Sequence, residues 1–395
     1  MISSEKIEEW VKEAEERPAS AAVILQYLGN RVRDLTGRNE ELRAENLALR
    51  TEKRVEEYEQ RITNLEYQLN ILRRQVGGEL PAGMLADAPA LAGQGALSFI
   101  LYDARGRLLR VGLNAAALSE GGELARLKAP FAAGSDAPRL LAVPTSEELL
   151  FVFSSGRIAS MPVTQIPAAE KPDWEQADAP QEPRGGETLA CVAPFSRLAM
   201  ADMILQASRR GFVKKLMTSL ASSVMNKHYI GTGATIQGDR THTLALAGKD
   251  DRLVLVSREG FLLALDVHDL PFSVEEAFKL GPTDLLAAGF VSGPGRAIVV
   301  MTQLGKVIHW SEDRLEVVHA MKSRGQALFS AQRREKGTRV VGAAAVRPED
   351  WSAALHSDGR LTAHMVQGLV DSGAIAVEGD LLDFAAFPLS LQKEK

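Results

Sequence analysis

Six times between residues 98 and 366, an apolar segment runs into a short turn that ends in glycine and is followed by a second apolar segment. These units span residues 98–111, 149–163, 202–216, 252–267, 297–311 and 352–366. Their turn glycines, which lie 45 to 55 residues apart, are Gly106, Gly156, Gly211, Gly260, Gly305 and Gly359. A period of this size is typical of β-propeller blades, each of which is one supersecondary unit. The repeat therefore predicts an all-β domain built from six similar units.

The sequences around the glycines are those of β-hairpins. A tight hairpin turn needs a residue with positive φ, and glycine adopts that conformation without a Cβ clash. The flanking segments, such as LVLV at residues 253–256, are apolar with little alternation, as strands buried on both faces are. A β-sandwich is the alternative, but regular spacing with room for about two more strands per unit favours radial repetition. We therefore predict a six-bladed β-propeller over residues 97–390, with an exposed acidic, proline-rich insertion at residues 167–186.

The first 76 residues are predicted to be helical. Residues 1–18 predict a short amphipathic helix that ends at Pro18, and residues 19–76 predict a coiled coil. Leucines recur every seven residues, at the d positions of a heptad, and two asparagines occupy a positions. Asparagine at an a position favours a parallel two-stranded coiled coil, because it pairs with the same residue of the partner chain. A second apolar series, two residues out of phase, predicts a bend near residues 51–54. The predicted homodimer contacts are Leu28, Val32, Leu35, Asn39, Leu42, Asn46, Leu49, Ile62, Leu65, Leu69 and Leu72.

Two alternatives bear on this N-terminal region. A helix that folds back into an intramolecular bundle gives a similar apolar pattern and stays open. A DNA-binding leucine zipper is excluded, because residues 19–25, which precede the heptads, lack a cluster of Arg and Lys. Residues 77–96, which begin with two glycines and are rich in Ala, Gly and Pro, predict a flexible linker.

The composition excludes several classes of protein. Charged residues make up 25% and hydrophobic residues 45% of the 395, so neither global disorder nor a membrane protein is indicated. The acidic start lacks the apolar core of a signal peptide, so we expect a cytoplasmic location, nucleoid-associated if the protein binds DNA. Cys191, the single cysteine, excludes an internal disulfide and predicts a buried, inert thiol.

No pattern of catalytic, cofactor or metal-binding residues stands out. The seven histidines never fall at a metal-binding spacing, and no Gly-x-Ser-x-Gly or phosphate-binding loop ending in Gly-Lys-[Ser/Thr] is present. We therefore predict no catalytic residue, no cofactor and no metal. The net charge of −5 does not itself suggest nucleic acid, but residues 296–347 hold ten basic and four acidic residues. Charge segregation of this kind permits a local basic track.

Residues 149–167 (LLFVFSSGRIASMPVTQIP) and 253–271 (LVLVSREGFLLALDVHDLP) share one order: strand, serine-containing turn, glycine, strand, Val-x-x-[Ile/Leu]-Pro. This order resembles the repeat of the C-terminal β-pinwheel domain of the DNA gyrase A subunit and its topoisomerase IV relative. The resemblance covers about residues 98–388, and six units match the six blades of that family. It implies a gyrase-like β-pinwheel that binds duplex DNA on its rim, without the cleavage domain.

In the gyrase family, one blade carries the basic signature Gln-Arg-Arg-Gly-Gly-Lys-Gly, which helps to wrap DNA. Residues 332–337 (QRREKG) resemble it, with Glu335 in place of the two glycines. The resemblance implies phosphate contacts from Gln332, Arg333, Arg334, Lys336 and Arg339. On another blade, the cations predicted to hold the next stretch of a curved duplex are Arg209, Arg210, Lys214 and Lys215.

These observations predict a non-enzymatic, dimeric protein that binds or bends duplex DNA, with a coiled coil joining two pinwheels. The alternative is a protein-interaction scaffold, because a fold does not fix a function and propellers commonly bind other proteins on a flat face. No membrane partner is expected.

Overall fold

The structure is a computed structural model that describes residues 97–112, 122–128, 131, 137–168, 172–196, 198–218 and 239–388. It also describes four residues nearer the N-terminus, all of them helical: Lys12, Gln26, Gly29 and Asn30. The chain divides into two units, Met1–Leu91 and Ala92–Lys395. The predicted coiled-coil contacts and the linker at residues 77–96 lie outside the described residues. No helix within the described ranges is long and apolar enough to cross a membrane.

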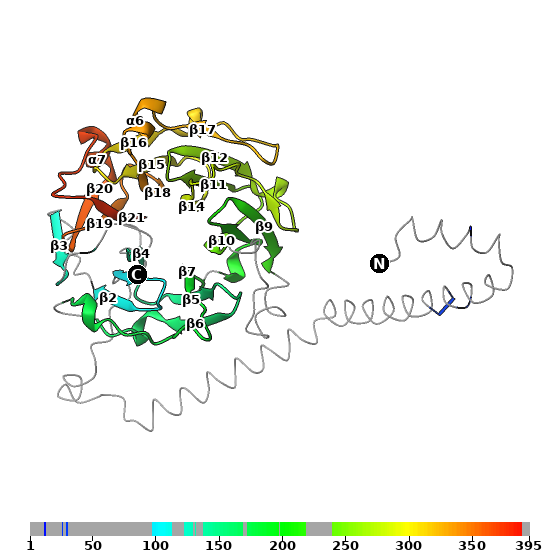
Figure 1. Ribbon diagram of the computed structural model, residues 1–395, viewed down its shortest axis with the longest axis horizontal. Helices are drawn as coiled ribbons and strands as arrows, with labels where there is room; N and C mark the ends of the chain where they lie inside the picture. The colour runs from blue at the N-terminus through cyan, green and yellow to red at the C-terminus, as the bar shows by residue number, and fades with distance from the viewer. Residues whose placement is uncertain are drawn as a thin grey trace, which may run out of the picture. The chain divides into compact units, whose positions relative to one another are not determined.

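The second unit is mostly β-sheet, and its described strands form six antiparallel sheets (Figure 1). Sheet 1 has the order β2 (Leu108–Gly112), β1 (Leu97–Tyr102), β4 (Arg139–Pro144), and sheet 2 has β6 (Ile158–Pro162), β5 (Glu148–Phe153), β7 (Leu189–Pro194). Sheet 3 has β10 (Thr241–Ala247), β8 (Met203–Ser208), β9 (Phe212–Met217), β13 (Glu275–Glu276). Sheet 4 has β14 (Leu286–Ser292), β11 (Arg252–Ser257), β12 (Phe261–Asp266), β17 (Gln326–Ala327).

Sheet 5 has the order β16 (Val307–Trp310), β15 (Ala297–Thr302), β18 (Val340–Val346). Sheet 6 has β21 (Leu381–Phe387), β19 (Trp351–His356), β20 (Arg360–Met365), β3 (Gly122–Arg126). Two short helices, α6 (Ala331–Glu335) and α7 (Val366–Ser372), lie in the connections of sheets 5 and 6. The strands that face the centre, here called the inner strands, are β4, β7, β10, β14, β18 and β21 (Figure 1).

Each of the six predicted hairpins is present, and its turn ends at the predicted glycine. The six turn glycines have φ between 75° and 89°, the left-handed region that glycine enters without strain. At Gly211 the turn is also crowded, because a Cβ there would lie 2.5 Å from the backbone oxygen of Phe278. The local signal in the sequence therefore identified the hairpins correctly.

The central strands are apolar on both faces because each sheet packs against two neighbours. In β1, Phe99 and Leu101 belong to a cluster shared with sheet 6, whereas Ile100 and Tyr102 belong to a cluster shared with sheet 2. This alternation follows from the pleat, which points successive side chains to opposite faces of a sheet. A strand between two sheets therefore needs apolar residues at every position, as its sequence has.

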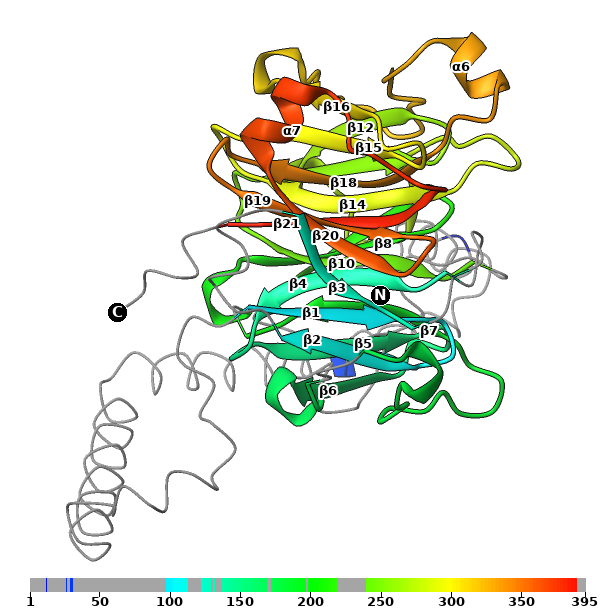
Figure 2. The same cartoon turned by 90° about the vertical axis from the view of Figure 1, so that its left-hand side faces the viewer.

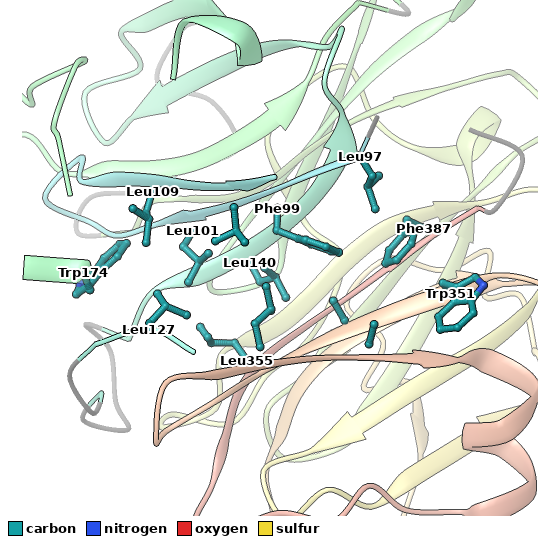
Figure 3. Close-up of a cluster of buried hydrophobic side chains, with 14 residues drawn as sticks. Leu97, Phe99, Leu101, Leu109, Leu127, Leu140, Trp174, Trp351, Leu355 and Phe387 are labelled. Carbon is teal, nitrogen blue, oxygen red and sulfur yellow. The ribbon is translucent and has the colours of Figure 1, made fainter. Parts of the chain in front are cut away.

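Six such apolar clusters join the sheets within the described residues. They lie between sheets 1 and 2, 2 and 3, 3 and 4, 4 and 5, 5 and 6, and 6 and 1. Figure 3 shows the last of these, in which Phe99 and Leu97 of sheet 1 meet Phe387 and Trp351 of sheet 6. Because the last sheet packs on the first, the six sheets form a closed ring.

The outer edges of several sheets are supplied by the next unit along the chain. β13 and β17 leave the connections before β14 and β18 and pair with β9 and β12 of the preceding units. β3 does the same across the closure and pairs with β20 of the last unit, with Leu361 opposite Ala125 (Figures 1 and 2). This pairing between units also covers sheet edges that would otherwise expose unpaired backbone groups.

The segment at residues 167–186 is not the fully exposed insertion that the sequence predicts. Its Trp174 is buried in the cluster between sheets 6 and 1, edge-to-face with Phe131 at 5.8 Å between ring centroids. Asp178 forms a β-bridge with Leu108 at the edge of sheet 1. The segment therefore covers the outer edge of sheet 1, as β13 and β17 cover the outer edges of sheets 3 and 4.

Candidate nucleic-acid interface

The predicted basic signature forms one turn of helix, α6, at the periphery of the ring (Figures 1 and 2). Its first backbone bonds run from the N–H groups of Arg333 and Arg334 to the carbonyl of Ser330. It ends at Gly337, which has φ of 83° and donates its N–H to the carbonyl of Arg334 at 3.0 Å. Glutamate is a better helix former than glycine, so Glu335 favours this turn where two glycines would oppose it.

The side chains of α6 divide into exposed and anchored cations. Arg333 and Lys336 are exposed to solvent, as is Gln332. Arg334 is half-buried, with its guanidinium carbon 4.7 Å from the ring centroid of Phe261 in β12 and with Nη1 donating to the carbonyl of Phe329. The helix therefore presents two exposed cations beside a third that packs on sheet 4.

Arg324, which lies outside the basic signature, joins this group. It is exposed, and its guanidinium carbon lies 4.7 Å from the centroid of the same Phe261 ring. One aromatic ring thus holds two guanidiniums, each with the favourable geometry of a cation over a π face. We call Arg324, Arg333, Arg334 and Lys336 the α6 rim cluster. In the sequence, Arg324 is marked only by the glycine that follows it. Gly325 has φ of 70°, as in a turn.

Arg339 follows α6, and its guanidinium is hydrogen-bonded to backbone carbonyls at the end of that helix. Its backbone N–H donates to Oε1 of Gln303 at 2.6 Å, and its Nη1 donates to the carbonyls of Arg334 and Thr338 at 3.0 and 2.9 Å. Arg339 lines a cavity at the centre of the ring. These contacts fix the start of β18 and use Nη1 of the guanidinium in hydrogen bonds to backbone carbonyls.

The predicted cations of sheet 3 point in several directions. Arg209, in the turn between β8 and β9, lines the same central cavity as Arg339. Arg210 donates from Nη1 to the carbonyl of Pro282 at 2.7 Å. Lys215 is 6% exposed, and its Nζ donates to the carbonyls of Val267 and His268 at 3.1 and 2.6 Å. Its ammonium group is therefore used inside the fold.

Lys214 precedes Lys215 on β9, so the pleat directs it to the opposite face of the sheet. It is half-buried, and burial lowers the pKa of its ammonium group. Residues 209–215 therefore do not present one continuous basic surface.

A second group of ionisable side chains lies at one end of sheet 4. Asp266, His268 and Asp269 hold possible metal-ligand atoms within 4.8 Å of one another. His319 Nδ1 lies 2.8 Å from Asp269 Oδ2, and His268 Nε2 lies 2.9 Å from Asp269 Oδ1. The Asp269 carboxylate raises the pKa of His319 through this hydrogen bond. No histidine spacing in the sequence marks these ligands, because the three of them include a single histidine, His268.

As the sequence predicts, Cys191 is buried, and burial raises the pKa of its thiol to about 12. It packs between sheets 2 and 3. A thiol of this pKa remains protonated at neutral pH, which is consistent with an inert core residue.

Among known proteins, similarity to this chain is found in solved structures but not in family models or curated sequences. No protein-family model and no curated protein matches this chain. Among solved structures, the DNA gyrase A C-terminal domain is 13% identical, covers 74% of this chain and 99% of its own, and has a TM-score of 0.54. The C-terminal domain of DNA topoisomerase IV is 18% identical over 75% and 95% of the two chains, with a TM-score of 0.46. The E. coli ParC C-terminal domain is 10% identical over 62% and 99%, with a TM-score of 0.40. The β-rich unit of this chain shares the fold of the gyrase A C-terminal domain.

Proposed function

We propose that this chain is a non-enzymatic DNA-binding protein and that its six sheets are the blades of a gyrase-like β-pinwheel. Duplex DNA binds at the rim of the pinwheel, on the α6 rim cluster. The observation that carries the proposal is the position of this cluster: the segment that resembles the gyrase signature forms an exposed helix at the periphery, with a fourth cation gathered beside it.

The geometry of the cluster suits phosphate binding. Arg333 and Lys336 are exposed and form no ion pair among the described residues. Arg324 and Arg334 lose less conformational entropy on binding than freely rotating side chains would, because their guanidiniums already pack on Phe261. Each phosphate that is neutralised releases condensed counterions, so several cations on one surface give sequence-independent, salt-sensitive binding.

We further propose that residues 19–76 form a parallel coiled coil that joins two pinwheels. The heptad leucines and the asparagines between them support this proposal. A dimer raises the effective concentration of the second pinwheel once the first is bound, so two weak sites give useful avidity.

The rival function is a protein-interaction scaffold. It is favoured by the net charge of −5 and by the fact that Lys215 donates to backbone carbonyls inside the fold, while Arg210 donates to the carbonyl of Pro282. A scaffold without a DNA site has no measurable affinity for duplex DNA at low salt, which separates the two functions.

The proposed function is tested by fluorescence anisotropy with a labelled duplex at low salt. The test variant combines Arg333→Glu with Lys336→Glu. The matched control combines Lys249→Glu with Arg314→Glu, which are exposed, change the net charge equally and lie where β10 and β16 end, away from the hairpin turns. We expect the test variant to lose at least about tenfold in affinity and the control to lose much less. Equal losses in both variants, or no binding by the unmodified chain, would overturn the proposal.

A further inference from the structure

A cavity of about 500 Å³ opens at the end of the ring where the hairpin turns lie, and residues at the beginning of all six inner strands line it. Five arginines converge there from four sheets: Arg139, Arg209, Arg240, Arg258 and Arg339. We call this space the axial cavity. Its volume falls within the range of about 300 to 1,000 Å³ that is usual for small-molecule sites.

The repeat explains why arginines meet at this point. Arg209 and Arg258 occupy the same position in two successive hairpins, two residues before the turn glycine. Arg240 and Arg339 occupy equivalent positions before the inner strands β10 and β18, where each carbonyl accepts the N–H of the neighbouring turn residue at 2.9 or 3.0 Å. The ring therefore directs equivalent positions of different units toward one axis.

Two of the four carboxylates that line the cavity accept hydrogen bonds from the backbone. Asp383 accepts the backbone N–H groups of Leu140 and Phe384 at 2.7 and 2.9 Å. Asp284 accepts those of Glu259 and Leu285 at 3.0 and 2.9 Å. Glu259 and Asp380 also line the cavity. No ion pair links these carboxylates to Arg139, Arg209 or Arg258 within the described part of the chain.

The electrostatic effect of the arginines is visible in the pKa values of the cavity. Burial and, after it, the charges of Arg240, Arg258 and Arg139 lower the pKa of Arg209 to about 10, against a smaller opposite effect of Asp239. Burial, followed by the charge of Arg139, holds the pKa of His242 well below its usual range. His242 is 8% exposed, and its Nε2 is buried without a hydrogen-bond partner in the described structure. The five arginines that line the cavity outnumber its four carboxylates, in a partly desolvated space where an anion interacts strongly.

We propose that the axial cavity binds a small polyanion that carries two or more phosphate groups, with Arg209 and Arg258 as its main ligands. Guanidinium groups match phosphate oxygens in bidentate geometry, and several of them converging from different sheets favour a multivalent anion over a single carboxylate. The site is separate from the α6 rim cluster and does not depend on DNA binding. A free small molecule fits the cavity, whereas a duplex stays outside it.

Isothermal titration calorimetry of the full chain with inorganic tripolyphosphate, at constant ionic strength, tests this site. We expect one saturable site per chain. Arg209→Gln and Arg258→Gln each weaken binding by about tenfold or more, as expected for the loss of a charged hydrogen bond, whereas Arg333→Gln on the rim changes it less than about twofold. The absence of saturable binding, or equal losses in the cavity and rim variants, would overturn the proposal.

Two further measurements keep the result unambiguous. If a cavity variant does not fold, thermal unfolding of the unmodified chain decides: tripolyphosphate raises Tm above the value in sulfate of equal ionic strength, and equal Tm values overturn the site. Saturating duplex DNA leaves tripolyphosphate binding unchanged. If the duplex displaces tripolyphosphate, the arginines bind backbone phosphate instead, and the proposal of a small-molecule site fails.

Discussion

The contact between Phe99 of β1 and Phe387 of β21 offers a direct test of ring closure in solution. The two residues lie near opposite ends of the β-rich unit in sequence, yet their ring centroids are 5.5 Å apart with an angle of 71° between the planes. Phe99 is fully buried and Phe387 is 4% exposed. Any energetic coupling between them requires the first and sixth sheets to be packed together.

The expected magnitudes follow from this geometry. Phe99→Leu and Phe387→Leu each remove part of a buried ring, for a loss of roughly 1 to 2 kcal/mol in the free energy of unfolding. An edge-to-face aromatic pair contributes about 0.5 to 1.5 kcal/mol beyond area burial. The double variant is therefore expected to lose less than the sum of the single losses, by about that amount.

Urea denaturation of the four proteins, followed by tryptophan fluorescence, measures the cycle. The matched control pairs Phe99→Leu with Phe278→Leu, because Phe278 is equally buried but belongs to the cluster between sheets 3 and 4. Losses in the control are expected to add to within about 0.5 kcal/mol. Additive losses for Phe99 and Phe387 as well would refute the closed ring.

Three further predictions follow from single residues. Gly211→Ala costs more stability than Gly337→Ala in thermal unfolding: both have positive φ, but a Cβ at Gly337 meets nothing within 4 Å, whereas at Gly211 it lies 2.5 Å from a backbone oxygen. Lys215→Met leaves the carbonyls of Val267 and His268 without this donor, so it destabilises by about 1 to 3 kcal/mol in denaturant titration while DNA affinity stays within about twofold. His319 titrates above 6.5 in NMR and returns toward that value in Asp269→Asn; since its folded-state pKa is raised, its stabilising effect is complete below the unfolded-state pKa and is lost as pH rises through the folded-state pKa.

The hairpins were predictable because their signals are local. Gly211 and Gly260 mark turns through their own backbone conformation, and apolar runs such as residues 253–256 reflect burial on both faces. The outer edge strands were not predictable. β3 and β17 carry no strand signal of their own, and their pairing depends on a partner that belongs to another unit. The repeat was therefore predictable from the sequence, whereas the pairing of each edge strand with the neighbouring unit was not.

The candidate site shows the same division. The motif that resembles the gyrase signature was recognisable in the sequence, but its folding as the helix α6 was not predicted. The directions of the side chains were not predictable either. Lys215 points inward because of the pleat of β9, Arg209 meets Arg258 only through the ring, and Arg324 joins α6 only through a shared contact with Phe261. A basic run therefore does not define a basic surface until the strand faces and sheet neighbours are known.

The salt dependence of duplex binding tests the central claim most directly. Each phosphate neutralised contributes about −0.9 to the slope of log K against log salt, so the four cations of the α6 rim cluster predict a slope of roughly −3 to −4 per pinwheel. Arg333→Glu with Lys336→Glu is expected to make this slope shallower by about 2, while Lys249→Glu with Arg314→Glu leaves it nearly unchanged. A slope near zero, or one that the rim variant does not alter, would contradict DNA binding at α6.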